Sequence, residues 1–260
     1  MTVPDTVIPS TPTLSEQPWP KWRVLLIRIW AGLLTLQALM MAQGIVVLLL
    51  GHVDDDAYFM AATSTVFKVL SLGGAAWVLW SGGRSVSAYW MILVGQLAWV
   101  ASDLLSPQVG GNPPLQGLVN ALILYGPLVA LRPRRRELLH LQVQPQALTT
   151  AIAAAGSCAL MTFTWHLATA SRHDELSFDA AGLYLTLAVM SLFAAARPAG
   201  GRWLIPLVSA GAALTGAAAV AFPNDYASPG RLGAALLLPW ALALAAAARR
   251  ESPATPEPHQ

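Results

Sequence analysis

KWRVLLIRIWAGLLTLQALMMAQGIVVLLLGHVDDD, residues 21–56, sets a long apolar run between two basic residues and three aspartates. The apolar part, residues 24–50, contains one charge, Arg28, which lies close enough to the basic side for its side chain to reach the membrane surface. Crossing about 30 Å of hydrocarbon takes roughly 20 apolar residues, because a helix satisfies its own backbone hydrogen bonds in lipid. The stretch therefore predicts a membrane-spanning helix whose two ends differ in charge.

Seven more apolar runs follow along the chain. They cover residues 58–80, 86–105, 115–131, 147–170, 178–196, 203–222 and 232–248. Hydrophobic residues make up 55% of the 260 residues and charged residues only 11%, an excess that a water-soluble core cannot absorb. The composition predicts an all-α, polytopic transmembrane bundle of about eight spans. It argues against nucleic-acid binding, because the cations lie in short clusters between apolar runs.

The loops between these runs alternate in charge, and short loops rich in Lys and Arg stay in the cytoplasm. The basic set carries Lys21, Arg23, Arg84, Arg132, Arg134, Arg135, Arg136, Arg197, Arg202, Arg249 and Arg250. The other set carries Asp54, Asp55, Asp56, Asp174, Glu175 and Asp225, with Arg172 and Arg231 as its cations. An even number of spans with this alternation predicts a plasma-membrane protein with both termini in the cytoplasm.

The two halves of the chain resemble each other. The second run ends in Gly82-Gly83-Arg84 and the sixth in Gly200-Gly201-Arg202, while the fourth and eighth contain Pro127 and Pro239. Copies of four spans each are parallel, related by an axis along the membrane normal. We predict two tandem four-helix units, residues 23–137 and 147–250, with a cytoplasmic linker at 138–146 and disordered tails at 1–22 and 251–260.

Two features of the second half indicate packing. Trp240 lies in the middle of the eighth run, away from the headgroup level that indole rings favour, and is interpreted as a packing residue. Small residues at Ser209, Ala213, Ala217 and Ala221 recur every four positions along the seventh run. Small side chains let helices approach closely in lipid, so this stripe predicts a contact face.

Lys68 is the main functional lead, because an ionisable group at membrane depth costs about 3 kcal/mol and needs a partner, a wet cavity or a neutral form. Polar residues concentrate in the same half of the chain. They are Gln37, Gln43, Ser64, Thr65, Gln96, Asp103 and Asn120. We expect a polar cavity inside the first unit that opens outward. The alternative is a structural lysine that snorkels or ties the bundle together.

Lys68, followed on the next run by Ser102-Asp103-Leu104-Leu105, resembles part of the pattern of lysoplasmalogenase-type membrane hydrolases. The resemblance covers two short pieces and implies a lipid-acting hydrolase with Lys68 and Asp103 in its site. The second half lacks the corresponding aspartate, and Tyr125 stands near where that family has a histidine. Ser64 and Thr65, one helical turn before Lys68, are geometrically suited to act as nucleophiles, although such hydroxyls usually bond back to a backbone carbonyl.

Metal and cofactor sites have weak support. His52 with Asp54 to Asp56, and His173 with Asp174 and Glu175, are acceptable ligands for a divalent cation, but solvated acidic loops explain them equally well. His166 has no histidine in six of the other runs to pair with across a haem, so no cofactor is predicted. The single cysteine, Cys158, excludes an intrachain disulfide.

Three function classes therefore stay open. The leading hypothesis is a non-enzymatic multi-pass protein that binds or transports a small solute, or serves as the membrane subunit of a larger assembly. The expected partners are the lipid bilayer, a small solute or lipid, and a membrane protein partner or a second copy of the chain. The second is the lipid hydrolase, and the third is a membrane sensor or scaffold without chemistry. Signatures of soluble enzymes, such as a phosphate-binding glycine loop, are absent from the sequence.

Overall fold

The protein is a bundle of α-helices. A computed structural model describes residues 19–41, 58–105, 115–132, 135–169, 175–201, 203–225 and 228–251. Within these ranges every regular element is helical, apart from an isolated antiparallel bridge between Val143 and Pro198. The predicted all-α class is confirmed.

The helices follow the apolar runs closely. In the first half they are α1 (Lys21–Met41), α3 (Tyr58–Ser81), α4 (Val86–Leu105) and α5 (Leu115–Leu131). A short 3-10 helix, η1 (Arg135–Leu139), follows, and then come α6 (Ala147–Thr169), α7 (Glu175–Ala195), α8 (Leu204–Ala221) and α9 (Gly230–Arg250). Residues 42–50 of the first predicted span lie outside the described residues.

Helix length and composition support embedding in a membrane. Among the described residues, five segments are long and apolar enough to cross a bilayer: Lys21–Met40, Ala61–Ser81, Ala147–His166, Leu204–Ala221 and Gly230–Arg250. Shorter apolar segments lie at Val86–Ala98, Ala121–Leu131 and Ala180–Ala195. The protein is therefore a helical membrane bundle, with five segments of spanning length and three shorter apolar ones in the described part of the chain.

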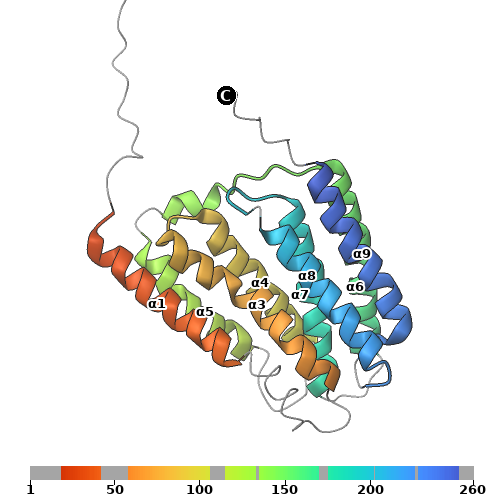
Figure 1. Ribbon diagram of the computed structural model, residues 1–260. Coiled ribbons are helices and arrows are strands. Elements are labelled where there is room, and N and C mark those ends of the chain that lie inside the picture. Colours follow the sequence, from red (N-terminus) through yellow and green to blue (C-terminus); the bar gives the residue numbers. More distant parts are fainter. Residues whose placement is uncertain are drawn as a thin grey trace, which may run out of the picture.

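The helices have the same neighbour relations in both halves of the chain. In the first half α1 contacts α3 and α5, and α4 contacts the same two helices. In the second half α6 contacts α7 and α9, and α8 contacts the same two helices. The halves meet through α3 and α4 on one side and α7 and α8 on the other, so α1 with α5, and α6 with α9, lie at the two flanks (Figure 1). We call these sets the first and second unit; the division of the chain into two tandem repeats stays a prediction.

The first turn of α1 and the last turn of α9 lie at the same end of the bundle (Figure 1). We call it the basic end, because it carries Lys21, Arg84, Arg132, Arg197 and Arg250. Here α3 ends in a Schellman turn, in which Gly83 donates to the Val78 carbonyl and Gly82 takes a left-handed φ of 58°. At the end of α7 the left-handed position is held by Arg197, with φ of 48°.

Hydrogen bonds join the two units at both ends of the bundle. At the basic end the linker pairs with the α7–α8 turn, since Gln144 donates to the Ala196 carbonyl over 2.9 Å, and Ser87 of α4 donates to the Ala199 carbonyl over 2.7 Å. At the opposite end the Asp225 carboxylate accepts from the Phe59 backbone N–H over 3.0 Å. Asp225 therefore caps α3 from the α8–α9 turn.

The predicted contact stripe on α8 is wrong in its second half. Ser209 is buried, but Ala217 and Ala221 are exposed, and the buried face continues through Ala212, Thr215 and Ala219 instead. Each step of four residues advances 400° around a helix of 3.6 residues per turn, about 40° beyond a full turn. A strict spacing of four therefore leaves the contact face after two or three steps.

Candidate functional site

The structure describes only some of the polar residues that are predicted to form a cavity. Lys68 is half-buried on α3, ten residues from the Tyr58 end, and Gln37 is exposed on α1. Gln96 of α4 donates from Nε2 to the Tyr125 hydroxyl of α5 over 3.2 Å. The side chains of Ser64, Thr65, Asp103 and Asn120, and all of Gln43, lie outside the described residues. The polar cavity therefore stays a prediction. The contact that the structure describes for Gln96, one of its candidate residues, is the hydrogen bond to Tyr125.

The metal candidates fall in loops that the structure does not describe. His52, Asp54, Asp56, His173 and Asp174 all lie outside the described residues. Within the described residues no group of three His, Cys, Asp or Glu side chains is placed to hold a metal ion.

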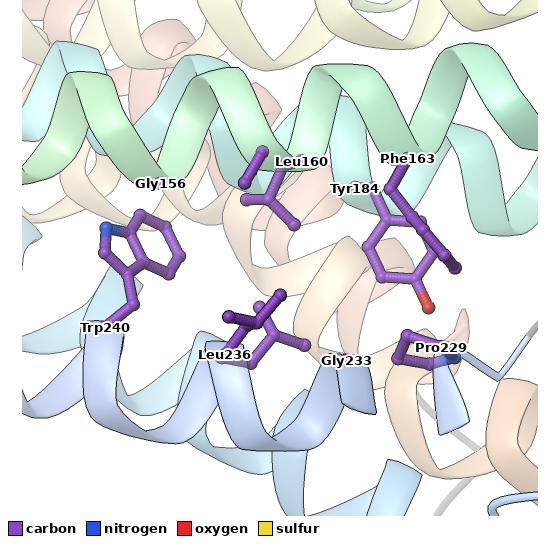
Figure 2. Close-up of a pocket in the computed structure, with 10 residues that line it drawn as sticks. Gly156, Leu160, Phe163, Tyr184, Pro229, Gly233, Leu236 and Trp240 are labelled. Carbon is purple, nitrogen blue, oxygen red and sulfur yellow. The ribbon is translucent and has the colours of Figure 1, made fainter. Parts of the chain in front are cut away.

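A crevice in the second unit is the best-defined candidate site. It has a volume of about 100 Å³ and lies between α6 and α9, with α7 behind it (Figure 2). Leu160, Tyr184 and Leu237 are buried at its base. Ala159 and Leu236 line it and are exposed, so the crevice reaches the outer surface of the bundle between the two flank helices.

Trp240 closes one end of the crevice. Its indole Nε1 donates to the Ile152 carbonyl over 2.9 Å, which ties the middle of α9 to the second turn of α6. The ring lies directly against Gly156, where a Cβ atom would overlap it (Figure 2). Gly156 is therefore required for the indole to reach the backbone of α6.

Aromatic rings and the start of α9 form the other end. Phe163 packs edge-on against Tyr184, with ring centroids 5.0 Å apart and an interplanar angle of 88°. The Tyr184 hydroxyl points toward Pro229 (Figure 2), which precedes α9. The lining is otherwise hydrocarbon and indole, so the crevice suits an apolar group.

At the basic end of the first unit, Arg132 holds a buried charge. Its guanidinium donates to the Gly83 carbonyl over 2.7 Å and to the Arg84 carbonyl over 3.3 Å, and it pairs with Glu137 over 3.2 Å. The Trp19 and Tyr89 rings lie 5.4 and 4.9 Å from its Cζ. These partners fix the ends of α3, α4 and α5 relative to one another, which is a structural role and not a ligand site.

The second unit uses a carboxylate at the same end. Glu251, which follows α9, accepts from the backbone N–H groups of Leu148 and Thr149 over 2.9 and 3.0 Å and from the Thr149 hydroxyl. These bonds, led by the one from the Thr149 hydroxyl, hold the pKa of Glu251 below its ordinary value. Arg197 adds to the effect by its charge and also donates to the Ala248 carbonyl over 2.9 Å.

The sequence identified Trp240 as a packing residue but did not indicate the crevice. Gly156 and Tyr184 lie in two different runs, Pro229 lies in the loop before a third, and each is ordinary in its own place. The signal available was the indole at mid-span, which needs a hydrogen-bond partner in lipid. Comparison with known proteins adds no assignment, because the chain matches no protein-family model, no curated protein and no solved structure.

Proposed function

We propose that the protein is a multi-pass protein of the plasma membrane, with eight spans and both tails in the cytoplasm. The separation of charge supports this topology: most of the described cations lie at the basic end, while Asp225 lies at the opposite end beside α3, where Arg231 is the described cation. Reporter enzymes fused to the two tails test it. Activity of both fusions on the cytoplasmic side is expected, and tails on opposite sides would contradict it.

The function that the geometry supports best is the binding of an apolar, membrane-dissolved molecule, specifically a phospholipid acyl chain, in the crevice between α6 and α9. The observation that carries this proposal is an apolar crevice that opens between two helices of spanning length. Its mouth therefore faces the hydrocarbon of the bilayer, where acyl chains are the abundant apolar groups.

Packing energy favours occupation of the crevice. An apolar group in the crevice contacts the lining side chains at close range, and each pair of atoms at optimal separation gains about 0.1 to 0.2 kcal/mol. Water does not compete for this space, because a lining with few polar groups stays dry. A chain that leaves bulk lipid gains no hydrophobic energy, so binding depends on this close packing.

Photochemical crosslinking tests the binding. The purified protein is reconstituted into vesicles containing a phosphatidylcholine with a diazirine in one acyl chain, and the labelled peptides are identified after irradiation. Labelling concentrated on the α6 and α9 residues that line the crevice is expected. Even labelling of all lipid-facing helices would contradict the proposal.

A filling variant and a matched control sharpen this experiment. Ala159→Leu adds bulk at the mouth of the crevice and is expected to reduce labelling of α6 and α9. Ala151→Leu makes the same change on an exposed position of α6 that does not line the crevice, and labelling is expected to stay at the level of the unmodified protein. Equal labelling of both variants would also contradict the proposal.

A further inference from the structure

Trp240 occupies an unusual depth for a tryptophan. Ten residues of α9 precede it and ten follow it, so the indole lies at the centre of a helix of spanning length. Tryptophan in membrane proteins gathers at the headgroup level, where its N–H meets polar partners. Here the N–H is satisfied instead by the Ile152 carbonyl over 2.9 Å. The ring is thus held in place at the middle of α9.

The indole also interrupts the groove between the two flank helices of the second unit. Because it lies on the backbone of α6 at Gly156, no space remains between α6 and α9 at that level. Beyond it, toward the basic end, the helices are joined again where Glu251 binds Leu148 and Thr149. The crevice therefore ends at Trp240 and extends only toward the opposite end of the bundle.

The length of the crevice matches one leaflet of a bilayer. Eleven residues separate Pro229 from Trp240, which at 1.5 Å per residue is about 16 Å. Half of a hydrocarbon core of about 30 Å is about 15 Å. A lipid whose headgroup lies at the surface near Pro229 would place the methyl end of its chain at the level of Trp240.

The dimensions favour a linear chain over a ring system. An engineered apolar cavity of about 150 Å³ takes up benzene. The crevice, at about 100 Å³, is smaller and is drawn out between two helices. A narrow crevice of this shape suits the terminal methylenes of an unbranched chain.

We propose that Trp240 is the stop against which the methyl end of an unbranched phospholipid chain rests, and that it sets the chain length that the crevice selects. The lipid enters from the leaflet at the end opposite the basic end, which is the outer leaflet in the proposed topology. This inference rests on the proposed function, since it specifies the ligand of the same crevice.

The orientation of the chain is tested on the unmodified protein. Two phosphatidylcholines are compared, one with a diazirine at the methyl end of the chain and one with a diazirine next to the ester. The methyl-end probe is expected to label Trp240, Leu236 and Gly156, and the ester-proximal probe is expected to label Phe163 and the start of α9. The reverse pattern would overturn the proposal.

The stop is tested with a series of methyl-end probes of increasing chain length. Trp240→Ala is expected to shift the maximum of the labelling yield toward longer chains and to move the labelled residues toward the basic end. Trp240→Phe keeps a ring at this level and is expected to shift the maximum less. Trp30→Ala removes the comparable indole between α1 and α5 and is expected to leave the maximum unchanged.

The outcomes separate the two proposals. Absence of concentrated labelling at the crevice contradicts the proposed function itself. Concentrated labelling with the same chain-length maximum in Trp240→Ala and in the unmodified protein contradicts only the role of Trp240. The orientation experiment tests the direction of the chain without any variant, and Trp240→Phe tests the stop if Trp240→Ala does not fold.

Discussion

In both units a tryptophan hydrogen bond joins the first helix to the fourth, but the donor lies on a different helix in each unit. In the first unit Trp30 of α1 donates to the Leu124 carbonyl of α5, and in the second Trp240 of α9 donates to the Ile152 carbonyl of α6. Each indole sits at the middle of its helix, but the donor is on the first helix of one unit and on the fourth of the other. In both units a tryptophan thus joins the first helix to the fourth, although the two tryptophans do not occupy corresponding positions.

At the basic end the arginines of the two units show the same reversal of donor and acceptor helices. In the first unit Arg132, after the fourth helix, reaches the carbonyls of the α3–α4 turn, whereas in the second unit Arg197, at the end of α7, reaches the Ala248 carbonyl of α9. Arg132 is almost fully buried, with 1% of its side chain exposed, and Arg197 is half-buried. The first unit therefore depends on a buried charge at this end, while the second depends more on Glu251.

The largest expected effect comes from removing the buried charge of the first unit. Arg132→Ala removes the hydrogen bonds from a buried charged group to the Gly83 and Arg84 carbonyls, and bonds to charged groups are worth about 1.5 to 3 kcal/mol each. Arg197→Ala removes a single hydrogen bond and is expected to cost about 1 kcal/mol. The two variants are compared by their free energies of unfolding, measured in mixed micelles with an increasing fraction of a denaturing detergent.

Arg132→Lys serves as a control, because it keeps the charge but loses the planar fork that contacts two carbonyls. Its stability is expected to lie between those of Arg132→Ala and the unmodified protein. Equal losses of unfolding free energy in Arg132→Ala and Arg197→Ala would show that the two arginines stabilise the basic end equally.

Two glycines test whether close packing at the flank is specific to the second unit. Gly156→Ala pushes a methyl group into the Trp240 indole and is expected to cost about 2 kcal/mol through overpacking. Gly126→Ala on α5 meets no atom within 4 Å and is expected to be neutral or to stabilise by up to about 1 kcal/mol through helix propensity. The same unfolding assay reads both, and similar losses would contradict the packing difference.

The joint between the units is tested at Asp225. Asp225→Ala removes the acceptor of the Phe59 N–H and is expected to cost about 1 kcal/mol, the usual value of an N-terminal cap. Faster hydrogen exchange in the first turn of α3 is the direct measurement. Asp225→Asn keeps an acceptor oxygen and should exchange slowly, so fast exchange in both variants would show that the charge, and not the hydrogen bond, holds the joint.

The smallest expected effect is a pH dependence at Glu251. Because folding lowers its pKa, the stabilisation is complete above the ordinary glutamate pKa of about 4.3 and is lost as pH falls through the lower folded value. Hydrogen exchange at Leu148 and Thr149 is expected to accelerate below that pH. In Glu251→Gln the exchange should no longer respond to pH in this range, and an unchanged response would assign it to another group.

Helix boundaries were largely predictable from the sequence. The runs at 86–105 and 115–131 coincide with α4 and α5, because Gly, Pro and charged residues interrupt the apolar pattern on both sides. The crevice was not predictable, because Gly156 and Trp240 are 84 residues apart and each fits its own helix without requiring the other. The cavity around Lys68 stays a prediction that rests on the first unit alone.

Taken by itself, the sequence determined that apolar segments of membrane length alternate with loops of opposite charge, since both properties can be summed locally along the chain. Only the tertiary structure decided that α6 faces α9, that Trp240 reaches Ile152 across Gly156, and that an open crevice remains beside them. In lipid nearly every face of these helices is apolar, so hydrophobicity does not choose between partners. The choice depends on the close fit of small and large side chains, which exists only once the helices are side by side.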